Sequence, residues 1–209
     1  MEEALGLRER KRRAAMRHVQ EVALTLFDEH GFDAVTIKQV ASAAGVAPSS
    51  VYRYFETKEG IVLYDPNRIA LSAPAGPAED GLPLFEALHR TITAHLAEHG
   101  DEAVDRRRAR YLMEAPSVRT AVAERLLTES PALASLIAER TGRSADELEV
   151  QVATGAFAGG LLAAVRHWHA GDYAEPLDEL LERTLGTLRD GPAVNLDRTG
   201  GGPARHDGY

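Results

Sequence analysis

The sequence contains no cysteine, which excludes disulfide bonds, thiolate metal sites and cysteine nucleophiles. It shows neither an N-terminal apolar segment of the signal-peptide type nor an uninterrupted apolar run of about 18 residues. We therefore expect no membrane contact and a cytoplasmic protein. The motifs G-x-x-x-x-G-K-[ST], G-x-S-x-G and H-E-x-x-H are also missing. These absences predict a protein that is not an enzyme, with no catalytic residue, metal ion or cofactor.

Histidines are the only residues that keep an enzymatic alternative open. His95 and His99 lie four residues apart on an expected helix, so they share one face and would supply half of a metal site. No further ligand-bearing motif lies nearby. His167 and His169 flank Trp168, a spacing that turns them to different helix faces. We favour solvated or capping roles for these four histidines.

The net charge of −8 is distributed unevenly along the chain. Residues 1–70 hold ten basic and ten acidic side chains, so the other 139 residues carry the whole −8. All three lysines, Lys11, Lys38 and Lys58, lie in the N-terminal part, and the segment 8–17 holds six basic residues against one acidic residue. Such a segment would neutralise nucleic-acid phosphates, although a solvated tail could have the same composition.

A short helix is predicted directly after Thr36, whose hydroxyl can cap the free N–H groups of the first turn. Gly45 follows the helix and can adopt the left-handed conformation that ends it. One apolar stripe at helical spacing supports this assignment: Ile37, Val40, Ala41 and Ala44.

A second helix is predicted from Pro48, which suits the first helical turn because its missing N–H would have no partner there. Val51 and Phe55 lie four residues apart on its inner side. The remaining positions carry hydroxyl groups, a guanidinium and flat rings: Ser49, Ser50, Tyr52, Arg53 and Tyr54. Two short helices joined by a tight turn, the second with a polar outer face, predict a helix-turn-helix whose second helix enters the major groove of DNA.

The run LFDEHGFDAVTIKQVASAAGVAPSSVYRYFETKEGIV resembles the N-terminal DNA-binding domain of the TetR family of transcriptional repressors. It contains, in order, the elements G-F-x-x-x-T, A-x-x-A-G-V, V-Y-x-Y-F and T-K-E, and it covers about a quarter of the chain. The resemblance implies an all-α fold, with an N-terminal three-helix helix-turn-helix domain and a C-terminal helical domain for ligand binding and dimerisation.

The resemblance also implies which residues contact DNA. Tyr52 matches the family tyrosine whose hydroxyl binds a backbone phosphate, and Thr36 and Lys58 lie at helix N-termini, which favour phosphate. Arg53 suits guanine readout, whereas pairing with Glu56 or with phosphate remains open. The full predicted set is Thr36, Lys38, Pro48, Ser49, Ser50, Tyr52, Arg53, Tyr54 and Lys58.

Composition divides the chain into five parts. We expect a flexible basic arm (1–11), a DNA-binding domain (12–64), a connector (65–83), a ligand-binding and dimerisation domain (84–189) and a disordered tail (190–209). The connector holds the segment SAPAGPAEDGLP, which is rich in proline and glycine. Apolar periodicity predicts helices at 12–30, 58–64, 84–99, 102–114, 116–130, 132–141, 146–170 and 176–189.

For the C-terminal domain, the resemblance implies that the last two helices pair with those of a second copy as a four-helix bundle. The earlier helices would enclose an apolar effector pocket, and the layout suggests the actinobacterial branch that senses acyl-CoA-like ligands. Candidate lining residues, for which ordinary core packing stays an alternative, are Phe85, Leu88, His89, Ile92, Leu96, Tyr111, Met113, Phe157 and Trp168.

The resulting hypothesis is a homodimeric repressor. It would bind an inverted-repeat operator in double-stranded DNA and be released by a hydrophobic small molecule. The alternative is a helical protein-interaction module without sequence-specific DNA binding, which would leave the basic, tyrosine-bearing helix without a purpose.

Overall fold

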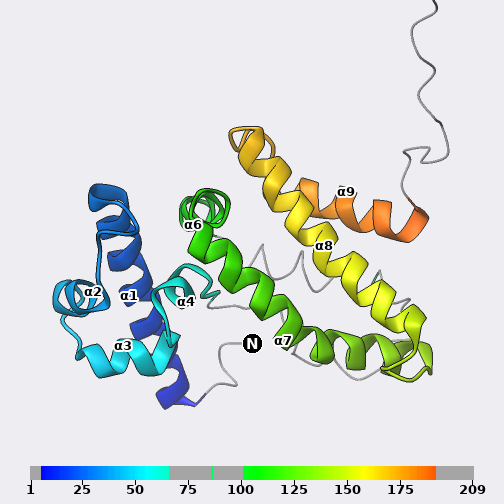
Figure 1. The fold of residues 1–209 in the computed structure, drawn as a ribbon, viewed down its shortest axis with the longest axis horizontal. Coiled ribbons are helices and arrows are strands. Elements are labelled where there is room, and N and C mark those ends of the chain that lie inside the picture. Colours follow the sequence, from blue (N-terminus) through cyan, green and yellow to red (C-terminus); the bar gives the residue numbers. More distant parts are fainter. Residues whose placement is uncertain (1–5, 66–85, 87–100, 192–209) are drawn as a thin grey trace, which may run out of the picture.

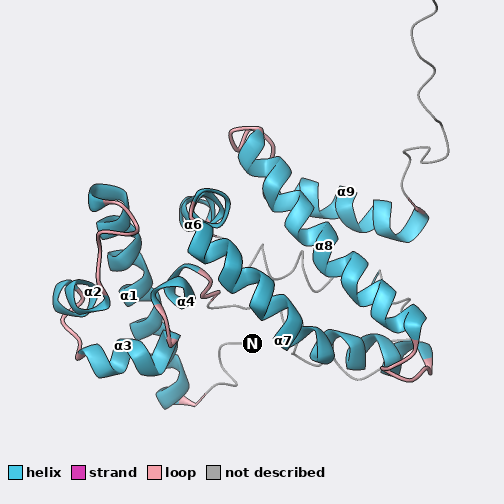
Figure 2. Ribbon diagram, viewed as in Figure 1, coloured by secondary structure: helices cyan, strands magenta, loops and turns pink. Residues whose placement is uncertain are grey.

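The computed structural model describes residues 6–65, Glu86 and 101–191, and within these ranges the chain forms helices joined by turns, with no strand (Figure 1, Figure 2). The helices α1–α4 gather at one end of the molecule, α8 and α9 lie at the other end, and α6 and α7 lie between them. Their bounds are α1 Leu7–His30, α2 Ile37–Ala43, α3 Pro48–Phe55, α4 Lys58–Val62, α6 Glu102–Glu114, α7 Pro116–Thr141, α8 Leu148–Ala170 and α9 Leu177–Asp190.

The N-terminal unit is built around α1, which packs against α2 and α4. Val19, Leu24 and Phe27 of α1 are fully buried, as are Val40 of α2 and Val51 of α3. Burial of these side chains supplies the apolar contacts that short helices need, because isolated helices of seven or eight residues are not stable in water. The all-α prediction and the predicted helix-turn-helix are confirmed.

The predicted stop and start signals around α2 are present. The Thr36 amide donates to Gln39 Oε1 at 2.8 Å, and the Gln39 amide donates to Thr36 Oγ1 at 3.3 Å, which forms a reciprocal capping box. Gly45 has φ 67°, the left-handed conformation that glycine adopts without steric cost.

Two differences from the predicted helices are larger than one or two residues. The basic segment 7–11, expected as a flexible arm, forms the first turns of α1, because arginine, lysine and glutamate are strong helix formers and no breaker follows Gly6. The predicted helices 116–130 and 132–141 form one helix, α7, that continues through Pro131. Leu133 and Ile137, both buried in the core shared with α8, supply packing that offsets the hydrogen bond lost at the proline.

The C-terminal helices form a second core in which α8 packs against both α7 and α9. Gly160 allows the close approach of α9, since an added Cβ would lie 3.0 Å from Leu188 Cδ1 and 3.3 Å from Thr184 Cγ2. By length and composition α8 could cross a membrane, although Glu149 and Gln151 interrupt its apolar residues, so it is not an uninterrupted apolar run. Only 22% of its most apolar window is buried in the molecule.

The structure describes little of three predicted segments. The connector 65–83 beyond Asp65, the helix 84–99 apart from Glu86, and the tail beyond Gly191 lie outside the described residues.

Candidate nucleic-acid interface

Helix α3 presents its polar face to solvent. Val51 and Phe55 point into the core, whereas Ser49 and Arg53 are exposed and Tyr52 is 52% exposed, which is unusual for a large aromatic side chain. An exposed tyrosine hydroxyl on a helix that is anchored in the core is suited to donating a hydrogen bond to a ligand.

Arg53 lies along the surface of α3. Its Nη2 donates to Ser50 Oγ at 3.4 Å, and its Cζ lies 5.2 Å from the centre of the Tyr54 ring. The alternative pairing with Glu56 is not formed in this structure. Because both contacts are weak and exposed, the guanidinium can turn toward another acceptor at small cost.

The predicted residues of α2 occupy different environments. Lys38 is exposed on α2 and has no hydrogen bond or ion pair within the described residues. The Thr36 hydroxyl donates to Gln39 Oε1 at 2.8 Å while it accepts from the Gln39 amide. Lys38 is therefore available to bind a phosphate, whereas the Thr36 hydroxyl serves the capping box.

Lys58, the first residue of α4, has other partners than the DNA phosphate predicted from the resemblance. Its ammonium group donates to the carbonyl oxygens of Phe32 at 2.6 Å, Val35 at 3.1 Å and Asp33 at 3.5 Å. A lysine has three N–H donors, and these contacts occupy all of them. Lys58 thus fixes the loop that precedes α2.

A cleft of about 860 Å³ separates the first turns of α1 from the end of α3. Among the described residues, six line the cleft and four of these are basic; they are Gly6, Arg8, Lys11, Arg12, Arg53 and Tyr54. The helical start of α1 brings the basic segment beside the recognition helix, which the sequence prediction missed because it treated residues 1–11 as an arm. The only available signal was the run of strong helix formers after Gly6.

The end of α4 joins the N-terminal unit to the C-terminal helices. Gln20 of α1 donates to the carbonyls of Ile61 at 2.8 Å and Tyr64 at 2.6 Å. The carbonyls of the two intervening residues accept hydrogen bonds from arginines. Arg108 of α6 donates to the Val62 carbonyl at 3.1 Å, and Arg125 of α7 donates to the Leu63 carbonyl at 2.9 Å. Carbonyls at a helix end often lack backbone partners, and here side chains from three helices bind those of the four residues at and just after the end of α4.

A second junction connects the end of α1 to α6. Asp28 accepts hydrogen bonds from Arg110 and from the Tyr111 hydroxyl, and its other oxygen pairs with Arg107 Nε at 2.7 Å. The Tyr111 ring packs against Phe27 and Phe32. Burial, and then the hydrogen bond to Asp28, raise the pKa of Tyr111 to about 12. Tyr111, predicted to line an effector pocket, instead packs in the core of the N-terminal unit.

The other predicted effector residues divide into two groups. Phe157 and Trp168 are buried in the C-terminal core, and Trp168 Nε1 donates to the Glu175 carbonyl at 2.9 Å; Met113 is partly buried. Phe85, Leu88, His89, Ile92 and Leu96 lie outside the described residues, as do His95 and His99. In the described part of the chain no three metal-ligating side chains are grouped, and His169 Nδ1 lies 2.7 Å from the Tyr173 hydroxyl.

The three-helix unit, the exposed polar face of α3 and the basic turns of α1 define a helix-turn-helix DNA-binding regulator carrying an additional helical domain. Two family comparisons agree. Residues 82–193 match the MftR C-terminal domain, and residues 20–64 match the bacterial regulatory proteins of the tetR family. Because the first match covers more than half of the chain, the protein belongs to the TetR family of transcriptional regulators.

Among curated relatives, the mycofactocin biosynthesis transcriptional regulator MftR of Mycobacterium tuberculosis is 25% identical over 192 residues, which cover 90% of this chain and 94% of the relative. Two solved structures share the fold. The repressor FadR of Thermus thermophilus, in complex with lauroyl-CoA, has a TM-score of 0.52 at 20% identity and covers 90% of this chain and all of its own. FadR of Bacillus subtilis, in complex with stearoyl-CoA, has a TM-score of 0.51 at 21% identity, and the match covers 82% of this chain and 96% of the FadR chain.

Proposed function

We propose that this protein is a repressor that binds an inverted-repeat operator as a two-fold dimer and is released by an apolar or amphipathic small molecule. The observation that carries the proposal is the exposed polar face of α3. Val51 and Phe55 anchor this helix in the core, and the basic first turns of α1 lie beside it. Phosphate contacts would come from Tyr52, Lys38 and the basic residues of the α1–α3 cleft. Pro48, Ser49 and Ser50 would face the base edges.

Lys58 would act on DNA indirectly in this proposal. Its donors bind the loop before α2, so it would orient α2 and α3 against the groove rather than bind a phosphate itself. Arg53 would exchange its weak contact with Ser50 for a guanine or a phosphate.

A face of α8 that no described residue covers supports the proposed dimer. Leu148 is 72% exposed and Val152 is 61% exposed, and an added Cβ at Gly155 or Gly159 would meet nothing within 4 Å. These four positions recur at helical spacing and form one apolar stripe with little side-chain bulk. A second copy of α8 could approach this stripe closely, and a four-helix bundle with α9 would remove the apolar surface from water.

We propose the chemical class of the effector from the ligands of two structures that share the fold. Two fold neighbours bind acyl-CoA molecules, so a fatty acyl thioester or a similar amphipathic metabolite is the class to test first. Such a ligand can release DNA only if its affinity is higher for the dimer arrangement that does not bind DNA than for the arrangement that does.

The test is nuclease footprinting of the DNA that flanks the protein's own gene, repeated across a salt series. A protected inverted repeat whose affinity falls steeply with salt would support the proposal. Arg189→Ala, an exposed change at the end of α9, serves as a control that should leave the footprint unchanged. Failure to bind any duplex selected from random DNA would favour the helical interaction module instead.

A further inference from the structure

The described residues form two large apolar cores, and α7 belongs to both of them. Val118, near the start of α7, is fully buried in the core of the N-terminal unit, together with Tyr111 of α6. Leu133 and Ile137, near the end of α7, are buried in the core shared with α8 and α9. Between the two cores, none of the residues 126–132 whose side chains are described is buried. We call this stretch the α7 joint.

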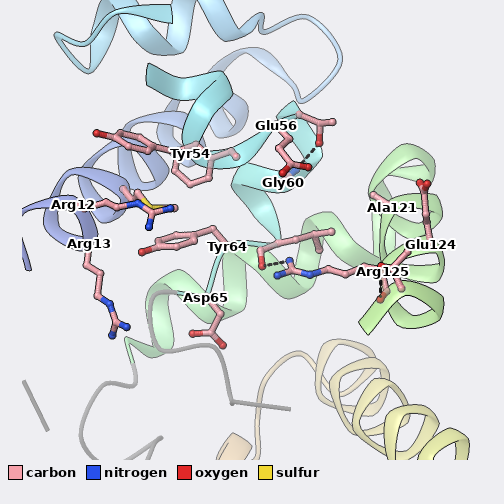
Figure 3. A pocket seen from close by; sticks show the side chains of 15 residues that line it. Arg12, Arg13, Tyr54, Glu56, Gly60, Tyr64, Asp65, Ala121, Glu124 and Arg125 are labelled. Carbon is pink, nitrogen blue, oxygen red and sulfur yellow. Dashed lines mark hydrogen bonds between the residues drawn. The ribbon is translucent and has the colours of Figure 1, made fainter. Parts of the chain in front are cut away.

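The part of α7 that precedes the joint is attached to the DNA-binding unit. Arg125, the last residue before the joint, donates to the Leu63 carbonyl at the end of α4, at 2.9 Å (Figure 3). Helix α6 is attached to the same unit, because Arg107 pairs with Asp28 of α1 at 2.7 Å. The helices α1–α4, α6 and α7 as far as Arg125 therefore form one body.

The backbone of the joint is weakened by a proline. Pro131 has no N–H, so the Leu127 carbonyl lacks the helical hydrogen bond that residue 131 would normally donate. Instead it accepts from Ser130 Oγ at 3.2 Å, and the Arg125 carbonyl accepts from Thr128 Oγ1 at 3.1 Å. Prolines and hydroxyl groups that bond back to helix carbonyls are the features at which helices bend.

The joint is also loosely packed on two sides. Between the described residues, a cleft of about 700 Å³ separates α7 from α1 and the end of α4 (Figure 3). Toward α8 lies a smaller cavity of about 90 Å³, which Leu126 and Ser130 line from α7 and Thr154 and Ala158 line from α8. Leu127 is 79% exposed. A segment beside such empty space has few contacts to lose when it moves.

We propose that the α7 joint is a hinge. Bending there moves the body that carries the DNA-binding unit relative to a second body, which consists of the end of α7, α8 and α9. Helix α6 would slide over the second body at a small third core, where Ala109 packs with Trp168 and Leu180. In a dimer held by α8, bending would change the separation of the two recognition helices. That consequence rests on the proposed function, whereas the bending itself does not.

The first measurement is hydrogen–deuterium exchange of the full chain without DNA or effector. Amides of residues 126–132 should exchange at least about tenfold faster than those of residues 133–138 in the same helix. Pro131→Ala restores the hydrogen bond to the Leu127 carbonyl and should slow exchange in the joint by about tenfold. Pro116→Ala, at the first position of α7 where a proline has no hydrogen bond to break, is the matched control and should leave the joint unchanged.

A distance measurement separates a hinge from local opening of the helix. The chain has no cysteine, so spin labels can be attached at two introduced cysteines, with the labelled chain diluted into unlabelled protein. The exposed pair Glu21→Cys and Ser135→Cys spans the joint, whereas the exposed pair Glu21→Cys and Ser117→Cys lies within one body. The distance distribution of the first pair should be at least about twice as wide as that of the second, and Pro131→Ala should narrow it.

A packing variant keeps the test decisive if Pro131→Ala does not fold. Ala158→Val adds bulk to the smaller cavity from α8 and should narrow the same distribution. Equal exchange on both sides of the joint, or equal widths for the two label pairs, would overturn the proposal. Neither measurement involves an operator, so both results stand whether or not the protein is a repressor.

Discussion

The Lys58 ammonium donates a 2.6 Å hydrogen bond to the Phe32 carbonyl and also lies 4.3 Å from the centre of the Phe32 ring. The same ring packs beside Tyr111 of α6. The first residue of α4 is thereby linked to the loop before α2 and, through one aromatic ring, to the C-terminal helices. A single side chain thus connects the orientation of the DNA-binding helices to the domain junction.

The first prediction separates a positioning lysine from a phosphate-binding lysine. Lys58→Met should lower the free energy of unfolding by about 2 kcal/mol, because hydrogen bonds from a charged donor to three carbonyls are lost. Operator affinity should fall while its salt slope stays unchanged. Lys38→Met should leave stability unchanged and reduce the salt slope by about one per subunit. Urea denaturation and binding isotherms at several salt concentrations measure both; a reduced salt slope in Lys58→Met would contradict the positioning role.

The contrast between these lysines shows what the sequence could not reveal. The caps of α2, the glycine turn and the apolar spacing of α3 are local signals, so the helix-turn-helix was predictable from residues 36–55. The partners of Lys58 lie 23 to 26 positions away, and only the packed fold brings their carbonyls to its ammonium group. Tyr111 was misplaced for the same reason: its aromatic character was visible, whereas its contacts with Phe27 and Asp28 depend on tertiary structure.

The second prediction concerns the close approach of α4 to α3. A Cβ added at Gly60 would lie 2.0 Å from the Phe55 carbonyl oxygen, a backbone atom that cannot turn away. Gly60→Ala should therefore destabilise the DNA-binding unit, although alanine in a helix interior is normally more stable than glycine by about 1 kcal/mol. Gly186→Ala on α9, where a Cβ meets nothing within 4 Å, should be neutral or stabilising. Thermal unfolding compares the two, and equal stabilisation by both would show that α4 can shift freely.

The third prediction follows from the buried Tyr111 hydroxyl. Its folded-state pKa of about 12 exceeds the usual value of 10.0, so the neutral form is favoured by folding. Its stabilising contribution is complete below the unfolded pKa and is lost as pH rises through the folded one. The free energy of unfolding should therefore decline between about pH 10 and pH 12, and less steeply in Tyr111→Phe. Urea denaturation at several alkaline pH values measures this; parallel declines in the two proteins would exclude Tyr111 as a contributor.

The fourth prediction tests the proposed α8 interface. Val152→Glu places a charge in the middle of the apolar stripe, where it would lose its water in a dimer, so the dimer should dissociate. Glu21→Gln, an exposed change on α1, should leave the dimer intact. Sedimentation velocity measures the oligomeric state. A Val152→Glu protein that remains dimeric would move the interface elsewhere, and a monomer that still protects both halves of an operator would refute a dimer held by α8.

The single tryptophan of the chain, Trp168, is buried between α8, α6 and α9, with its indole N–H bound to the Glu175 carbonyl. All indole fluorescence of the protein therefore originates in the C-terminal domain. A change in that emission when DNA is added would report rearrangement at a distance from the recognition helix. An effector titration could be followed in the same way, with no label attached to the protein.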